Sequence, residues 1–136
     1  MKVLLDEGAF LPTRAHKTDA GLDIRSPRKA FIPPNNSRII RTGVHIQLPK
    51  NTAGVVISKS GLNINHNLTS TGLIDEGYTG EIVVKLYNHG SEPYFVQEGD
   101  KISQLVVIPV LYEDVELVDS FPGTERGNNG FGSSGR

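Results

Sequence analysis

The chain has 136 residues, of which 37% are hydrophobic and 21% charged, a composition typical of one globular domain. Fourteen basic and fifteen acidic residues leave a formal net charge of -1, which argues against stable nucleic-acid binding through a basic surface. The absence of Cys excludes disulfide frameworks, thiolate metal sites and cysteine nucleophiles, and it fits a reducing, cytoplasmic location.

The N-terminal stretch has a short apolar run from Val3 to Leu5, which ends at Asp6. That run is too short for the core of a signal peptide or for a membrane-spanning helix. We therefore expect no association with a membrane.

Short apolar runs dominate the rest of the chain. Segments 44–48 and 82–87 carry Val, Ile or Leu at every second position, which predicts strands with one buried face. Segment 102–112 is rich in β-branched residues and predicts a buried strand, whereas a helical turn near 59–62 stays open. Turn residues separate the runs at Pro33–Asn36, Pro49–Asn51, Asn88–Ser91 and Glu98–Asp100. This spacing predicts a single-domain, all-β sandwich or barrel.

The last fourteen residues differ from the rest. Residues 123–136 hold five Gly, and Phe131 is their single aromatic residue. Such a segment buries too little apolar surface to order itself. We therefore divide the chain into a β domain over residues 1–122 and a flexible C-terminal arm over residues 123–136.

Five segments combine Gly with polar side chains. They are Ala20–Ile24, Ser58–Leu62, Gly72–Glu81, Gly99–Leu105 and Arg126–Gly135. Taken singly, each is typical of ordinary structure: a strand end, a helix cap, a hairpin turn, a tight turn and a flexible tail. Their function becomes apparent only when the five are considered together.

In this order, the five segments resemble the five motifs of the trimeric dUTPase family. The third segment reads Gly-Leu-Ile-Asp-Glu-Gly-Tyr-Thr-Gly, and the fifth reads Arg-Gly-Asn-Asn-Gly-Phe-Gly-Ser-Ser-Gly. These two are the most specific, and the resemblance spans residues 20–135. It implies a jelly-roll-like β-barrel that forms a homotrimer, in which motifs from different subunits share each site and the arm closes over a neighbour's site.

The resemblance also implies an activity, the Mg²⁺-assisted hydrolysis of dUTP to dUMP and pyrophosphate. This reaction keeps uracil out of DNA and supplies dUMP for thymidylate synthesis. Asp75 matches the carboxylate that activates the attacking water, and Asp23 matches the residue that holds Mg²⁺ through water. Tyr78 matches the ring beneath the deoxyribose, where it excludes a 2′-hydroxyl, and Phe131 matches the ring that stacks over uracil.

The remaining substrate-binding residues also follow from the resemblance. Contacts to the phosphates are implied for Lys59, Ser60, Gly61, Gln104, Arg126, Ser133 and Ser134. Gly72, Ile74 and Gly132 complete the implied substrate-binding set. Backbone groups of a hairpin within residues 65–72 are expected to recognise uracil, because a backbone N–H opposite O4 would reject the amine of cytosine.

The chain departs from the family pattern at three positions. Lys59 replaces an Arg of the second motif, which keeps the charge but loses the two-pronged guanidinium. Lys101 and Ser103 stand where the fourth motif has Arg and Ala. The segment between Leu62 and Gly72 is about one residue shorter than in close relatives.

Two other functions remain as alternatives. A dCTP deaminase, or a bifunctional deaminase–dUTPase of related fold, needs a catalytic Glu and an Arg pair around a Ser-Ser segment, which Ser58–Gly61 lacks. A non-catalytic nucleotide-binding β-module, such as a single-strand-binding barrel, predicts a basic groove rich in aromatic residues. The near-zero net charge gives that alternative little support.

Overall fold

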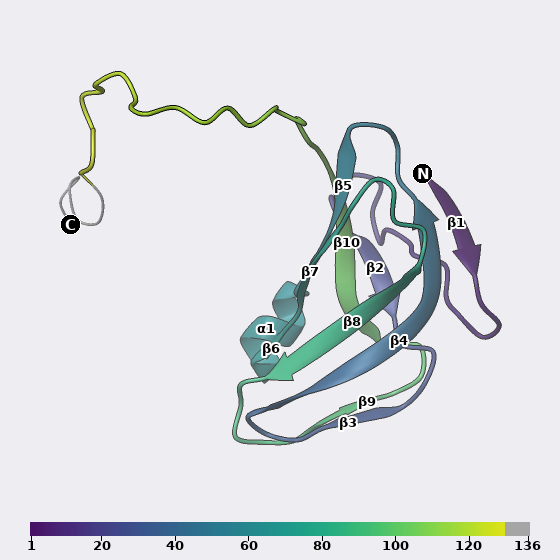
Figure 1. Ribbon diagram of the computed structural model, residues 1–136. Helices are drawn as coiled ribbons and strands as arrows, with labels where there is room; N and C mark the ends of the chain where they lie inside the picture. Colours follow the sequence, from purple (N-terminus) through teal and green to yellow (C-terminus); the bar gives the residue numbers. More distant parts are fainter. Residues whose placement is uncertain (130–136) are drawn as a thin grey trace.

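The computed structural model describes residues 1–129, and Figure 1 shows their arrangement. Within these residues the chain forms ten strands and one short helix. In chain order they are β1 (Lys2–Leu5), β2 (Leu22–Arg25), β3 (Ala30–Ile32), β4 (Asn36–Gln47), β5 (Thr52–Ile57), α1 (Ser60–His66), β6 (Leu68–Thr69), β7 (Thr71–Ile74), β8 (Glu81–Asn88), β9 (Tyr94–Val96) and β10 (Lys101–Pro109). The described helix is too short to cross a membrane.

The strands pair antiparallel in three sheets. Sheet A has the order β1-β4-β8-β6, sheet B has the order β2-β10-β5-β7, and β3 pairs with β9. The described strands do not close into a continuous barrel, but their arrangement is compatible with a jelly roll. The predicted all-β, single-domain class is therefore confirmed.

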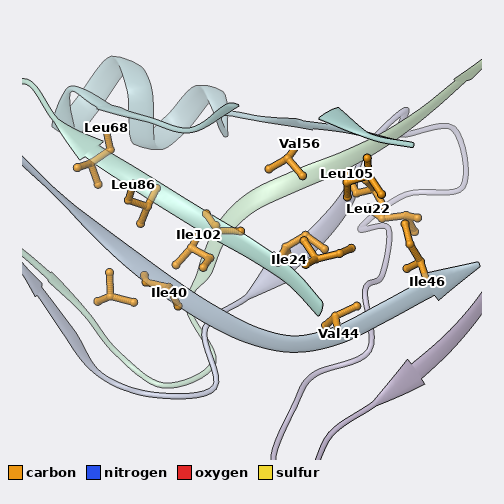
Figure 2. Close-up of a cluster of buried hydrophobic side chains, with 14 of the residues drawn as sticks. Leu22, Ile24, Ile40, Val44, Ile46, Val56, Leu68, Leu86, Ile102 and Leu105 are labelled. Carbon is orange, nitrogen blue, oxygen red and sulfur yellow. The ribbon is translucent and has the colours of Figure 1, made fainter. Parts of the chain in front are cut away.

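The core lies between sheets A and B. Ile40 and Val44 of β4 and Leu86 of β8 face Ile24 of β2 and Leu105 of β10, as Figure 2 shows. None of the five is more than 2% exposed. Antiparallel sheets that bury one face each produce the period of two seen in the sequence. The strands predicted over 44–48 and 82–87 are confirmed, with β4 ending at Gln47 and β8 running to Asn88.

The strand predicted over 102–112 is shorter than expected. β10 ends at Pro109, and beyond it Leu111 is 84% exposed and Tyr112 is 64% exposed. Proline cannot donate to a ladder, so the strand stops where this residue enters. The prediction of a buried strand over 102–112 was therefore wrong beyond Leu105, because Val106 and Val107 are half-buried, Ile108 is exposed and residues 110–112 lie outside the strand.

The helix is longer than the turn that the sequence left open. α1 ends where Asn67 adopts a left-handed conformation with φ 54°, a common way to terminate a helix. None of its seven residues is buried, so there is no apolar stripe by which to recognise it.

The hairpin expected within residues 65–72 is not formed. β6 joins sheet A beside β8, and β7 joins sheet B beside β5, so the chain changes sheets at Ser70. The buried Ser70 donates its backbone N–H to Ser58 Oγ at 2.9 Å, and its hydroxyl lies 2.8 Å from that of Ser103. These hydroxyls satisfy polar groups at the crossing, where a ladder of paired strands is absent.

Candidate functional site

Asp23 of β2 carries a buried negative charge at the first candidate site. The residue is 6% exposed; its Oδ2 accepts a hydrogen bond from Lys101 Nζ at 2.6 Å, and its Oδ1 is paired with the Lys59 ammonium. Burial raises the pKa of Asp23, but the hydrogen bonds and charges of Lys101 and Lys59 outweigh burial. The net pKa therefore lies below the ordinary value of 3.8. At neutral pH the site holds one carboxylate between two cations.

Gln104 lies next to this carboxylate in the sheet. On β10 it is opposite both Asp23 of β2 and Ile57 of β5, and its Nε2 donates to the Ser58 carbonyl at 3.0 Å. A Cβ added to Gly21 would lie 3.0 Å from Gln104 Cδ, so the close packing of this amide requires glycine there. Antiparallel pairing thus brings residues from three separate segments of the sequence into one row.

The second motif begins at Ser58, directly after Ile57 of this row. Lys59 precedes α1 in an extended conformation, with φ -75° and ψ 130°, and Ser60 and Gly61 begin the helix. A Cβ added to Gly61 would meet nothing within 4 Å, so its backbone borders open space. The structure therefore brings together Asp23, Lys59 and Gln104, with Ser60 and Gly61 following directly.

A second group of candidate residues borders a cavity of about 260 Å³ between β7 and β8. Gly72, Ile74, Asp75 and Tyr78 all contribute to its lining. Ile74 is buried, whereas the Asp75 carboxylate is on an exposed residue directly after β7. The cavity is therefore lined partly by apolar side chains, and an accessible carboxylate lies at its border.

The loop 75–80 is held in shape by its own contacts. Tyr78 N–H donates to the Asp75 carbonyl at 3.0 Å, and Tyr78 Oη donates to the Glu81 carbonyl at 3.0 Å. The Tyr78 ring lies so close to Gly80 that an added Cβ would be 2.5 Å from ring Cζ. The orientation of Tyr78 therefore depends on glycine at position 80.

The two groups are far apart within one chain. Asp23, Gln104, Ile57 and Thr71 form one row across sheet B, and Asp75 lies beyond Thr71 at the far end of β7. Strand spacings of about 4.8 Å and rises of about 3.3 Å per residue give a separation of roughly 20 Å between Asp23 and Asp75. A single subunit thus does not bring both carboxylates to one reacting atom.

The remaining candidate residues lie toward the C-terminus. Arg126 donates from Nε to the Asn129 carbonyl at 3.1 Å, in a stretch that extends away from the sheets in Figure 1. Phe131, Gly132, Ser133 and Ser134 lie outside the described residues.

Lys101 is a site residue that the sequence did not assign a function. It begins β10 beside an irregularity in the pairing with β2, between Lys101 and Ser103. Its ammonium lies 2.6 Å from Asp23 Oδ2. In the sequence, Gly99 and Asp100 indicate a turn before Lys101. They do not indicate that the following strand pairs with β2, which is what brings Lys101 to Asp23.

A metal ion would find few protein ligands here. Within residues 1–129, no three His, Asp or Glu side chains lie close enough together to hold a metal ion. Asp23 offers hard carboxylate oxygens, each of which retains acceptor capacity beside its lysine. This donor set fits an ion such as Mg²⁺ that keeps its waters and takes its other ligands from a substrate.

Sequence relatives cover nearly the whole chain. A deoxyuridine 5′-triphosphate nucleotidohydrolase from Clostridium novyi is 45% identical, covering 99% of both chains. The enzyme of the same name from Gloeothece citriformis is 43% identical and covers 96% of this chain and 92% of its own.

Solved structures show the same fold. The dUTPase of Staphylococcus bacteriophage 80alpha with dUPNHPP has a TM-score of 0.92 at 31% identity, covering 99% of this chain and 98% of its own. A mutant dUTPase from phage phi11 of S. aureus, described with a structural Mg(II) ion, has a TM-score of 0.81 at 31% identity, covering 88% of this chain and 97% of its own. Because the dUTPase family model also matches residues 7–135, this chain belongs to the dUTPase family.

Proposed function

We propose that the chain hydrolyses dUTP to dUMP and pyrophosphate, which limits uracil in DNA and supplies dUMP for thymidylate synthesis. The observation that carries the proposal is the recess between β7 and β8, which Asp75 borders together with Gly72, Ile74 and Tyr78. Its walls are apolar where a base and sugar would lie, and its border is acidic where the phosphate chain would begin. Membership of the dUTPase family supports the same assignment.

The recess can distinguish uracil by its backbone. β7 is an edge strand of sheet B, so one of its two backbone edges has no strand partner within the described sheets. Outward-facing N–H and C=O groups of such an edge complement the acceptors and the N3–H donor of uracil. Cytosine carries an amine in place of O4, so it would set a donor against a donor. Tyr78 packs beneath the deoxyribose in this proposal and leaves no room for a 2′-hydroxyl.

Asp75 acts as the general base. Its carboxylate takes a proton from water as the water oxygen attacks the α-phosphorus. The bond from the α-phosphorus to the bridging oxygen breaks, and pyrophosphate leaves with the electron pair. An ordinary carboxylate is a weak base, so positioning of the water supplies much of the rate.

The triphosphate binds to the cations and donors of the first group. Lys59 and Lys101 are held at Asp23 and are partly exposed, so a polyanion can draw their ammonium groups toward itself. Ser60, Gly61 and Gln104 add directional donors near the α- and β-phosphates. Arg126, Ser133 and Ser134 bind near the γ-phosphate, and Phe131 with Gly132 covers the base.

Asp23 is the protein group that would hold Mg²⁺, through water. When bound, the ion neutralises phosphate charge and fixes the conformation of the triphosphate. Lys59 and Lys101 would bind the phosphate oxygens in place of Asp23, which would leave the Asp23 carboxylate oxygens free to accept from water.

The active protein is a homotrimer with shared sites. The separation of roughly 20 Å between Asp23 and Asp75, from strand spacing and rise, supports a site assembled from more than one subunit. Val115 is 99% exposed and Leu117 is 98% exposed, so this apolar stretch fits packing against a neighbour. Residues 1–122 form the domain of each subunit, and residues 123–136 form the arm that closes over a neighbour's site.

The direct test is release of pyrophosphate from dUTP, UTP, dCTP and dTTP, each with Mg²⁺ and with EDTA. We expect rapid release from dUTP with Mg²⁺, and rates lower by at least about 100-fold for the other nucleotides, because mismatched polar groups discriminate strongly. Tight dUTP binding without release would instead identify a non-catalytic nucleotide-binding protein. Release of ammonia from dCTP would identify a deaminase.

A further inference from the structure

The carboxylate of Glu76, directly after Asp75, is held by two donors from distant parts of the chain. Its Oε2 accepts the Asn51 backbone N–H at 2.7 Å and the Tyr112 hydroxyl at 2.9 Å. Asn51 belongs to the turn between β4 and β5, and Tyr112 lies three residues beyond the end of β10. One side chain therefore joins the loop 75–80 to two other segments.

The start of the C-terminal segment is bound at the same place. Val110 N–H donates to the Asn51 carbonyl at 2.9 Å, and Pro109 is paired with Thr52 across β10 and β5. Tyr112 also contacts the domain through its hydroxyl, and beyond it the segment extends away, as Figure 1 shows. We call residues 110–112 the arm root.

A displacement of Glu76 is passed to Asp75. The two residues share one rigid peptide plane, and the loop is closed by the Tyr78 N–H to the Asp75 carbonyl at 3.0 Å. Pulling on the Glu76 side chain therefore tilts Asp75, the residue whose carboxylate is the proposed general base. A misplacement of about 1 Å in a reacting group can cost two orders of magnitude in rate.

The electrostatics agree with this close arrangement. The pKa of Tyr112 lies above its ordinary value of 10.0. The largest cause is the hydrogen bond to Glu76, followed by burial and by the charges of Glu76 and Asp75. The phenol thus stays protonated and keeps donating across the neutral range.

We propose that Glu76 and Tyr112 are positioning residues that connect the Asp75 loop to the arm root, so that the path of the C-terminal arm and the placement of Asp75 depend on one carboxylate. The inference rests on the proposed dUTP hydrolysis and on the arm of residues 123–136. It assigns no contact with substrate to either residue.

The kinetic test combines Tyr112→Phe with deletion of residues 123–136. In the full chain we expect Tyr112→Phe to lower kcat about three- to ten-fold with KM within about two-fold, because it removes one hydrogen bond to a charged group. Part of the loss in kcat comes from the changed path of the arm, and the shortened chain has no arm. We therefore expect Tyr112→Phe to lower kcat of the shortened chain less than about two-fold. Tyr87→Phe removes a phenol elsewhere on the surface and serves as the matched control.

Glu76 is tested by a graded pair of substitutions. Glu76→Gln keeps one acceptor oxygen and should retain kcat within about three-fold, whereas Glu76→Ala should lose at least about ten-fold. Equal losses from Tyr112→Phe in the full and shortened chains, or no loss in either, would overturn the connection between arm and loop.

Amide hydrogen exchange tests the inference without catalysis. Glu76→Ala should speed exchange at the Asn51 and Val110 amides by at least about ten-fold relative to Glu113→Ala, because a surface hydrogen bond that is lost lets the segment open. Unchanged exchange at both amides overturns the inference even if dUTP is hydrolysed. If the wild-type protein does not hydrolyse dUTP but Glu76→Ala speeds exchange at the two amides as expected, the proposed function is contradicted. The connection between the Asp75 loop and the arm root is then still supported.

Discussion

At the scale of single residues, Asp23 shows how burial and neighbouring charges compete. Burial alone would favour the protonated carboxyl, but two ammonium groups reverse the balance and hold the pKa below 3.8. Asp75, by contrast, is exposed to solvent. The same residue type is thus a partner of lysines in one place and, in the other, an accessible carboxylate that we propose as the base.

The pH dependence of stability follows from Asp23. Because its pKa is depressed in the folded protein, its contribution is present above the ordinary value of 3.8 and is lost as the pH falls through the lower, folded value. We expect Asp23→Asn to lower the free energy of unfolding by about 1–2 kcal/mol at pH 7, since charge-assisted hydrogen bonds are lost while both lysines stay partly hydrated.

Urea unfolding at pH 7, 5, 4 and 3 measures this effect. The difference between wild type and Asp23→Asn should be constant at pH 7 and 5 and should shrink below pH 3.8. Asp114→Asn, an exposed substitution, is the control and should stay within about 0.5 kcal/mol of wild type. A difference that grows on acidification contradicts the assignment.

At the scale of elements, the loop between β7 and β8 owes its shape to one close approach. The Tyr78 ring leaves only 2.5 Å between its Cζ and a Cβ built at Gly80, whereas a Cβ at Gly77 meets nothing within 4 Å. Two glycines in one loop therefore have different roles, which their sequence context does not distinguish.

This contrast supplies a matched pair of variants. Gly80→Ala should displace the Tyr78 ring, lower kcat/KM for dUTP about ten-fold or more and reduce the preference for dUTP over UTP, because the ring no longer fills the place of the 2′-hydroxyl. Gly77→Ala should leave both quantities within about two-fold. Steady-state kinetics with the two nucleotides measures the effect, and equal behaviour of the variants would refute it.

The elements also show what the sequence could predict. The strands over 44–48 and 82–87 were predictable because each buries one face, and the resemblance of five segments correctly indicated the family. Helix α1 was left open because none of its residues is fully buried, and the change of sheet at Ser70 depends on hydroxyl partners distant in sequence. The pairing of Lys101 with Asp23 was not predictable for the same reason, since it needs β2 and β10 side by side.

At the scale of the whole molecule, the candidate site is divided. Asp23, Lys59 and Gln104 gather at one part of sheet B, and Asp75 with Tyr78 lies beyond the other end of β7. In a symmetric trimer, rotation brings one part of each subunit to the other part of its neighbour. In the proposed trimer, such division makes activity a property of the assembly.

Mixing two inactive variants tests the division. Asp75→Asn should bind dUTP without hydrolysing it, and Lys59→Ala should bind the triphosphate weakly. When equal amounts of the two variants exchange subunits at random, about a quarter of wild-type activity should return. One site in four then combines an intact Asp75 from the Lys59→Ala subunit with an intact Lys59 from the Asp75→Asn subunit. The double variant mixed with wild type is the control. Failure to restore activity after verified subunit exchange would contradict shared sites.

The stretch beyond Pro109 has a consequence for turnover in a cell. Val115, Leu117 and Phe121 are 99%, 98% and 87% exposed along an extended backbone. Endopeptidases bind their substrates in extended form, and exposed segments are where nicking concentrates. In the proposed trimer, we expect a subunit without partners to be cut here and removed, so that protein abundance follows successful assembly rather than synthesis alone.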